Sequence, residues 1–261
     1  MRVGALNVGF TGLAHSLHTV AQLLDASRCD VLFLSDMRIS RRKIGRARQL
    51  LESAVQREWL LLTGIRQLPY RPIGIGVLVH SSLAYRAQQL QVLFPPDAPE
   101  SEWEEAVGGR IFLLQIKKPF GNVTWWVVGI YQHVANAGNA RKRTLLLRCL
   151  ADIAERAQRE NCYLLIIGDA NAAPDGGRWH CRPRSPLYAS DAETVEWARK
   201  LGLRETPQIK LTPTWKACVR SCSAVLDRAW HLPASLQLSS AHTLWADRSA
   251  VDHALVYVDL P

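Results

Sequence analysis

The feature that most constrains this sequence is an aliphatic run that ends in a glycine and two polar residues. Residues 164–167 are all leucine or isoleucine and predict a buried strand, and Gly168 permits a sharp turn directly after it. Asp169 and Asn171 follow two residues apart, so their side chains point to the same side of an extended chain. A carboxylate there can accept a proton from water, while a carboxamide holds it in place. Asp and Asn are also ordinary turn formers, so this segment alone leaves both interpretations open.

Polar residues also stand beside several other apolar runs of the chain. They are Asn7, Asp36, Tyr131, Asp227 and the adjacent pair Asp252-His253. A sheet that brings such residues to one rim builds a site there, and connecting loops complete it. The sequence therefore predicts a site assembled from segments that are far apart along the chain.

Taken in order, these segments resemble the endonuclease/exonuclease/phosphatase superfamily, which includes abasic-site endonucleases, DNase I and the endonuclease domains of non-LTR retrotransposons. The family's series is strand-Asn, strand-Glu, strand-Tyr, Gly-Asp-x-Asn, a late Asp and Ser-Asp-His. The matching positions are Asn7, Asp36, Tyr131, residues 168–171, Asp227 and Asp252-His253. Residues 212–215, Thr-Pro-Thr-Trp, look like the family's Thr-Trp stretch. The resemblance covers nearly the whole chain, from Asn7 to His253.

Three positions depart from the family pattern. Asp36 stands where the family has glutamate, which shortens a metal ligand by one methylene. Gly9 stands where some relatives have an acid, and Val251 replaces the usual serine before Asp-His. An inactive nucleic-acid-binding relative is therefore an alternative to an enzyme.

The resemblance implies an α+β fold, a four-layer α/β/β/α sandwich of two packed mixed β-sheets with outer helices. We expect one domain over residues 1–261, and a composition that is 48% hydrophobic is ample for one core. Hydrophobic spacing predicts helices over 14–27, 40–58, 139–160 and 190–201. Strands are predicted over 59–65, 73–80, 85–92, 110–117, 124–132, 224–232, 235–245 and 254–259. The prolines at 95, 96 and 99 predict an exposed loop.

The formal net charge of +9 is concentrated in two basic runs. The first contains Arg38, Arg41, Arg42, Lys43, Arg46 and Arg48, and the second contains Arg141, Lys142, Arg143 and Arg148. Each run follows a predicted rim residue, so both should leave the same rim and attract a polyanion. Either run alone is more typical of a solvated basic helix face. Together they favour duplex DNA as the partner.

The resemblance also implies roles for the individual residues. Asp36, with Asn7 and Asp252, would hold Mg²⁺, or Mn²⁺ as a substitute. Asp169 would deprotonate the attacking water, and Asn171 would fix its position. His253, paired with Asp227, and Tyr131 would donate to the phosphate, leaving 3′-hydroxyl and 5′-phosphate ends.

Loop residues near the rim are further candidates for substrate contacts. Arg178 and Trp179 lie in a glycine-rich loop, where the indole could stack on a base. His133 and His180 are second-line candidates.

We expect a DNA-nicking endonuclease most like the retrotransposon domains, which implies a larger polyprotein with reverse transcriptase. An abasic-site repair enzyme and a deadenylase-like RNase or phosphoinositide phosphatase are the alternatives with the same fold. No run approaches the roughly 18 apolar residues of a membrane span, so we expect no membrane partner. Scattered cysteines suit reduced thiols, and we expect an intracellular, nuclear protein.

Overall fold

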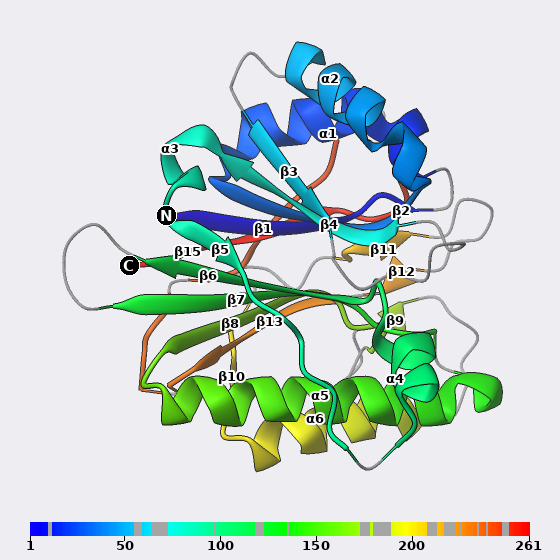
Figure 1. Ribbon diagram of the computed structural model, residues 1–261, viewed down its shortest axis with the longest axis vertical. Helices are drawn as coiled ribbons and strands as arrows, with labels where there is room; N and C mark the ends of the chain where they lie inside the picture. The colour runs from blue at the N-terminus through cyan, green and yellow to red at the C-terminus, as the bar shows by residue number, and fades with distance from the viewer. Residues whose placement is uncertain are drawn as a thin grey trace.

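A computed structural model gives the fold of most of the chain. It describes residues 1–9, 12–54, 59–63, 73–96, 98–117, 123–134, 136–172, 178–179, 189–207, 213–216, 223–224, 226–233, 235–238, 240–246 and 251–261. Two six-stranded mixed sheets pack face to face between two layers of helices (Figure 1). This is the four-layer α+β sandwich that the sequence predicted.

The first sheet gathers both ends of the chain. Its order is β14 (His242–Leu244), β15 (Leu255–Asp259), β1 (Arg2–Asn7), β2 (Val31–Ile39), β4 (Ile73–His80) and β3 (Trp59–Thr63). β1 runs parallel to β2, and its other neighbour, β15, is antiparallel. The first and last segments of the sequence are thereby adjacent.

The second sheet has the order β10 (Arg204–Glu205), β13 (Asp227–Leu232), β8 (Tyr163–Asp169), β7 (Thr124–Tyr131), β6 (Ile111–Lys117) and β5 (Ala87–Gln89). β7 and β8 are parallel, and the other pairs are antiparallel. A small third sheet joins β11 (Trp215–Lys216), β12 (Ser223–Ala224) and β9 (Arg178–Trp179). It lies on the right of the sandwich in Figure 1, below β2, and Trp215 of β11 forms a bridge with His253.

Helices cover the outer face of each sheet. α1 (Leu13–Ser27) and α2 (Ile44–Ala54) cover the first sheet, and α4 (Glu100–Val107), α5 (Ala140–Arg159) and α6 (Ala189–Lys200) cover the second (Figure 1). The shorter pieces are η1 (Arg41–Lys43), α3 (Ser81–Ala84) and η2 (Ala137–Asn139). Alternate strand residues such as Phe33, Val127 and Ile167 form the core between the sheets. In that core the Phe33 ring packs directly on the backbone of Gly129, since a Cβ there would fall 2.2 Å from the ring.

Four sequence predictions differ from the structure in extent. The helix expected over 40–58 starts as η1 and α2 ends at Ala54. The strand expected over 85–92 is only β5, because α3 and a turn precede it. The strand expected over 235–245 is reduced to β14, and that over 224–232 is divided into β12 and β13.

Helix α4 was not predicted at all. Pro99 precedes its first residue, and Glu100 and Glu102 lie in its first turn. The side chain of Trp103, also in this helix, is fully buried. Proline at a helix start and acids in the first turn are favourable helix-start signals. The prolines at 95, 96 and 99 predicted an exposed loop here, so the start of the helix was not recognised.

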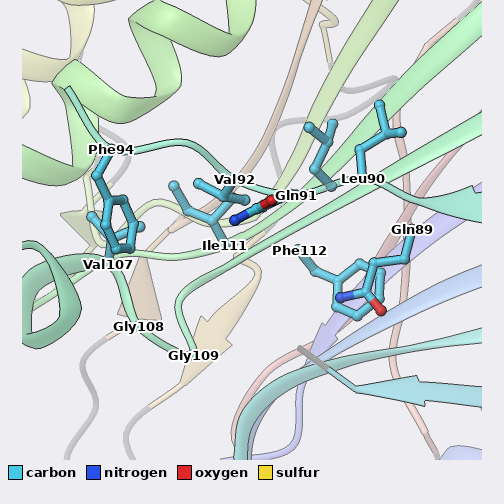
Figure 2. Close-up of a pocket in the computed structure, with 11 residues that line it drawn as sticks. Gln89, Leu90, Gln91, Val92, Phe94, Val107, Gly108, Gly109, Ile111 and Phe112 are labelled. Atoms are coloured by element: carbon cyan, nitrogen blue, oxygen red, sulfur yellow. The ribbon is translucent and has the colours of Figure 1, made fainter. Parts of the chain in front are cut away.

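A cavity of about 210 Å³ lies beside β5 and β6 (Figure 2). Leu90, Val92, Phe94 and Ile111 make its wall largely apolar. None of the predicted site residues lines it, so this cavity is not the predicted site.

Candidate active site

Strand register places three of the predicted residues side by side. Tyr131 on β7 is the register partner of Asp169 on β8, and Asp169 is the partner of Asp227 on β13. The close pairing of β7 and β8 requires Gly168, whose φ is +141° and whose added Cβ would fall 2.3 Å from the carbonyl oxygen of Ile130. The aliphatic run therefore ends with its acid in the middle of three adjacent strands.

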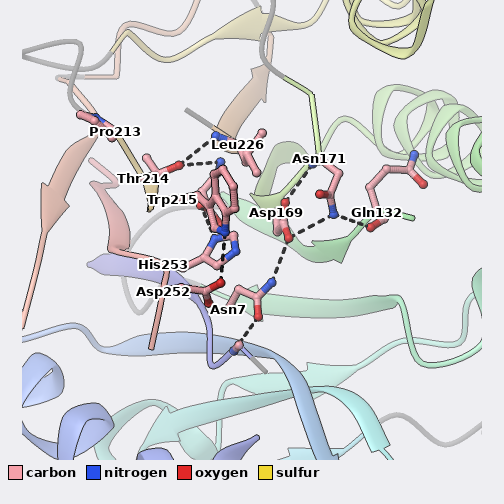
Figure 3. Close-up of polar contacts among 12 residues, drawn as sticks. Asn7, Gln132, Asp169, Asn171, Pro213, Thr214, Trp215, Leu226, Asp252 and His253 are labelled. Carbon is pink, nitrogen blue, oxygen red and sulfur yellow. Dashed lines mark hydrogen bonds and ion pairs between the residues drawn. The ribbon is translucent and has the colours of Figure 1, made fainter. Parts of the chain in front are cut away.

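Asp169 is buried and held by three hydrogen bonds (Figure 3). Asn7 Nδ2 donates to its Oδ2 at 2.9 Å, from the opposite sheet. Asn171 donates twice, from its backbone N–H to Oδ1 at 2.9 Å and from Nδ2 to Oδ2 at 3.2 Å. Burial raises the pKa of Asp169 to about 6, although His253 and these donors oppose the rise. The carboxylate is oriented rigidly and is a stronger base than a solvent-exposed one.

His253 and Asp227 form a buried pair next to Asp169. The two atoms His253 Nδ1 and Asp227 Oδ2 are 2.9 Å apart. Burial alone would disfavour the imidazolium, but the charge and hydrogen bond of Asp227 prevail and raise the pKa of His253 to about 9. A proton on Nδ1 thus points at Asp227 and leaves Nε2 to face another group.

Tyr131 is fixed by a residue that sequence reasoning missed, Arg110. The Arg110 guanidinium lies 4.4 Å from the centre of the Tyr131 ring, and its Nη1 donates to the carbonyl oxygen of Tyr131 at 3.3 Å. Burial, reinforced by the charge of Asp36, raises the pKa of Tyr131 to about 12. The phenol keeps its proton at neutral pH and can donate it in a hydrogen bond. Arg110 lies in the turn directly before β6 and belongs to no motif, so no sequence signal identified it.

Two of the three predicted metal ligands lie beside this cluster (Figure 3). Asn7 Oδ1 accepts the backbone N–H of Gly9 at 2.8 Å, and Asp252 Oδ2 accepts Trp215 Nε1 at 3.1 Å. Asp252 Oδ1 is buried and accepts no hydrogen bond from the described residues. A Cβ on Gly9 would fall 2.5 Å from that oxygen, so no side chain, acidic or otherwise, fits at position 9 in this arrangement. A buried carboxylate oxygen with no donor suits a cation.

Asp36, the third predicted ligand, is engaged by Arg38. Arg38 Nε and Nη2 donate to Asp36 Oδ1 and Oδ2, each at 2.9 Å. Both residues have positive φ, +54° and +51°, within an irregular part of β2 between Ser35 and Ile39. Such irregularities re-aim side chains near sites. Across the described residues, no three His, Cys, Asp or Glu side chains form a metal-binding group. The oxygen ligands suit a hard divalent cation, with Asp36 available only if its ion pair with Arg38 opens.

Solved structures with the same architecture cover almost the entire chain. The 3′ phosphatase NExo from Neisseria, bound to a product DNA hairpin, is 17% identical and has a TM-score of 0.71, over 100% of this chain and 99% of that one. An AP endonuclease from Leishmania major is 14% identical with a TM-score of 0.73, over 98% and 86%. The endonuclease domain of TRAS1, a telomere-specific non-LTR retrotransposon, is 14% identical with a TM-score of 0.64, over 99% and 97%.

The chain has the endonuclease/exonuclease/phosphatase fold. No protein-family model and no curated protein matches the sequence significantly. The assignment therefore rests on three-dimensional structure, with the ordered motifs of the sequence agreeing with it.

Three cations of the second basic run, Arg141, Lys142 and Arg143, are engaged within the protein, whereas Arg148 is exposed. Arg143 is only 2% exposed and donates to the carbonyl oxygen of His133, so it is structural. Arg141 and Lys142 are ion-paired with Glu102 and Glu105 of α4. Helix α4, which was not predicted, thus supplies the two acids that neutralise the charges of Arg141 and Lys142.

The first basic run is more accessible. Arg42 and Lys43 are exposed in η1, directly before α2, and the Arg38 side chain is 47% exposed although it is paired with Asp36. Arg41 lies in η1, but its side chain is outside the described part of the structure. The accessible positive charge follows Asp36, as the sequence predicted.

The remaining loop candidates have different outcomes. Arg178 and Trp179 form β9, whose backbone pairs with β12, while their side chains lie outside the described residues, as does His180. His133 is buried, its Nε2 lies 2.8 Å from the carbonyl oxygen of Ala106, and burial lowers its pKa to about 4. The expectation that His133 faces substrate is therefore wrong.

Thr214 is a further residue that was not proposed for the site. Its buried hydroxyl accepts the backbone N–H groups of Leu226 at 2.9 Å and Asp227 at 3.0 Å. The backbone N–H of Ala254 donates to its carbonyl oxygen at 2.7 Å. The Thr-Trp stretch noted in the sequence is thus the support that holds Asp227 near His253.

Proposed function

We propose that this protein is a divalent-metal-dependent phosphodiesterase that nicks DNA. The observation that carries this proposal is the convergence of Asn7, Asp169 and Asn171 with the His253–Asp227 pair. These groups come from both sheets and from both ends of the chain. Buried carboxylates and a charged imidazole are costly to assemble, so their convergence favours catalysis over a purely structural role.

Asp169 is proposed as the general base. Its pKa of about 6 leaves it largely ionised at neutral pH, yet basic enough to take a proton from water. Asn171 and Asn7 hold Oδ2, so the carboxylate cannot rotate away from the attacking water. The water would attack phosphorus in line with the leaving 3′-oxygen.

His253 and Tyr131 are proposed to donate to non-bridging phosphate oxygens. His253 would use Nε2, because Nδ1 faces Asp227, and it carries positive charge at neutral pH. Tyr131 would use its phenol proton. Donors that are fixed before the reaction stabilise the developing negative charge. The products would be 3′-hydroxyl and 5′-phosphate ends.

Asn7, Asp36 and Asp252 would hold the metal ion, with Mg²⁺ preferred and Mn²⁺ as a substitute. Such an ion neutralises the scissile phosphate and stabilises the leaving oxygen. Asp252 Oδ1, which is buried and accepts no hydrogen bond from the part of the chain that the structure describes, supports a cation at this position.

Duplex DNA is the proposed substrate, and chromosomal target nicking of the non-LTR retrotransposon kind is the proposed context. The exposed cations after Asp36 and the net charge of +9 support a polyanionic partner. This context would place the protein in the nucleus, alongside a reverse transcriptase. Among the described residues, no helix is long and apolar enough to cross a membrane.

A plasmid assay tests the proposal. We expect supercoiled DNA to be nicked with Mg²⁺ and left intact with EDTA. Asp169→Asn should lower the rate about 10²–10⁴-fold, the usual contribution of a general base. Lys200→Ala, which removes an exposed charge on α6, is the control and should nick normally. Equal nicking by Asp169→Asn and the natural chain would refute the assignment of Asp169.

A second candidate is a nucleic-acid-binding relative without activity. The engagement of Asp36 by Arg38 favours it, because both carboxylate oxygens are already occupied. DNA binding without any Mg²⁺- or Mn²⁺-dependent nicking would select this candidate. An abasic-site endonuclease would instead cleave an abasic duplex far faster than intact DNA.

A further inference from the structure

A second cavity of about 480 Å³ lies where α1, the end of β2 and α2 meet. His15, Arg38, Lys43 and Arg46 line it, and all four are exposed. None of the described lining residues is acidic. The cavity therefore presents a concentration of positive charge to solvent.

The same cavity has an apolar wall. Leu17, Met37, Ile39, Ala47 and Leu50 contribute to it. Leu50 is 43% exposed and so offers apolar surface to a ligand in the cavity. A phosphate alone would not need such a wall, and an apolar ligand would not need three cationic side chains. A nucleotide has both an anionic part and a flat, largely apolar base.

Arg38 connects this cavity to the candidate active site. Its side chain lines the cavity and also pairs with Asp36, and the charge of Asp36 acts on Tyr131 and Arg110. A strand whose phosphate lies at the site would thus pass beside the cavity. Its volume lies within the range of about 300–1,000 Å³ that is typical of small-ligand sites.

We propose that the cavity between α1 and α2 holds one unstacked nucleotide of the substrate strand, next to the scissile phosphate. The cations would bind its phosphate, and the apolar wall would contact its base. This inference rests on the proposed DNA-cleaving function and narrows its substrate to DNA with an unpaired nucleotide there. A paired base must first break its pairing and leave the stack, whereas an unpaired base leaves it at the least cost in free energy.

Binding can be measured apart from cleavage, with Asp169→Asn protein and no Mg²⁺. The probes are a duplex with one unpaired 2-aminopurine and the same duplex with that base paired. Titrations should be repeated with the unpaired base at successive positions. At one position, we expect the unpaired probe to bind about tenfold more tightly than the paired probe, which is the contribution expected of one base contact. The 2-aminopurine emission should change on binding at that position. Equal affinity and unchanged emission at every position would overturn the proposal.

Two cavity variants localise the effect. Ala47→Phe, made in the Asp169→Asn background, fills the wall and should abolish both the preference and the emission change, while binding to the paired duplex persists. Leu50→Gln, at an exposed position that should not affect folding, should reduce the preference several-fold. A melting curve confirms that each variant is folded. Retention of the full preference by both folded variants would overturn the proposal.

A pair of charge variants separates phosphate contact from general attraction. Arg46→Ala should weaken binding of the unpaired probe about fivefold and reduce the slope of affinity against salt by about 1. Lys200→Ala removes one charge on α6, on the opposite side of the sandwich, and should change neither (Figure 1). Identical behaviour of the two variants would count against a phosphate at Arg46.

The outcome also distinguishes this inference from the proposed function. A base-dependent preference in a protein that never nicks DNA would support the cavity and refute the nuclease. Nicking that is indifferent to unpaired nucleotides, with no emission change, would support the nuclease and refute the cavity site.

Discussion

At the scale of single residues, environment gives three ordinary side chains distinct protonation states. Asp169 is a buried carboxylate with a raised pKa, His253 is a charged imidazole, and Tyr131 is a neutral phenol. Their register and hydrogen-bond partners cause these differences, since a solvent-exposed Asp or His would behave otherwise. One base and two donors are therefore available together at neutral pH.

The pH dependence of nicking should follow from these states. Below pH about 6, Asp169 gains a proton and cannot accept one from water, so activity should fall. Above pH about 9, His253 loses its proton and its positive charge, so activity should fall again. We expect a bell-shaped plot of kcat/KM against pH, which falls on both the acid and the alkaline side.

Asp227→Asn should displace the alkaline limb of that plot. Without the Asp227 carboxylate, burial lowers the pKa of His253 against only the smaller effects of Asp169 and Asp252, so the limb should move to lower pH. The acid limb should remain while the rate falls. An alkaline limb at the same pH in this variant would mean that His253 is not the donor.

The ion pair of Asp36 with Arg38 should compete with the metal ion. Arg38→Ala leaves the Asp36 carboxylate without its bidentate partner, so we expect nicking to reach half its maximal rate at a lower Mg²⁺ concentration. Asp36→Glu should leave activity equal or higher. Arg42→Ala removes a neighbouring exposed cation that has no bond to Asp36 among the described contacts and serves as the matched control. An unchanged Mg²⁺ requirement in Arg38→Ala would argue against Asp36 as a ligand.

At the scale of elements, the site depends on a short segment that contributes no reacting group. Residues 213–216 lie between the strand that carries Asp227 and the strand that follows His253. The Thr214 hydroxyl accepts the backbone N–H of Asp227, and the Thr214 carbonyl oxygen accepts the backbone N–H of Ala254, the residue after His253. Trp215 Nε1 donates to Asp252, and Trp215 forms a bridge with His253. This segment therefore holds Asp227 and His253 at a fixed distance from each other.

Thr214→Val keeps the shape but removes the acceptor of two buried N–H groups. We expect a loss of about 1–3 kcal/mol in the free energy of unfolding, together with lower kcat, because Asp227 loses its support. Thr214→Ser should restore both. The matched control is Thr206→Val, since the Thr206 hydroxyl bonds to His231 at the far end of β13. It should lose stability alone. Equal losses of kcat in the two valine variants would contradict a positioning role for Thr214.

At the scale of the whole molecule, charge is distributed unevenly over one rim. The basic run after Asp36 includes accessible cations, whereas Arg141 and Lys142 are paired with acids from α4. Exposed ion pairs contribute little stability and can exchange partners. The total of 32 lysines and arginines therefore overstates the number of cations that are available to DNA.

Releasing the paired cations should strengthen DNA binding. In the variant Glu102→Gln with Glu105→Gln, Arg141 and Lys142 lose their partners, so we expect tighter binding and a steeper fall of affinity with salt. The slope should steepen by at most about 2, one for each cation. Glu196→Gln releases cations on α6 instead and is the control. An unchanged slope would mean that α5 lies away from DNA.

The sequence predicted the layers and the site positions that have local signals. Aliphatic periodicity marked β4 and α5 almost to the residue, and the ordered motifs indicated Asn7, Asp169, Asn171, Asp227 and His253. The elements were predictable because hydrophobic period is a local property of the chain. The residues that the motifs indicated lie together in the structure, whereas their roles stay predictions. The sequence did not predict helix α4 or the bounds of the short edge strands, because these depend on the residues against which they pack.

Only the tertiary structure decided which charged groups meet. The sequence could not show that Arg143 is buried, that Arg110 covers Tyr131, or that Arg38 occupies Asp36. Each outcome depends on a partner distant in sequence, or on a local turn with positive φ that follows from the packing of β2. The physical reason is that residue type determines what a side chain can do, whereas burial and neighbouring charge determine its ionisation and accessibility.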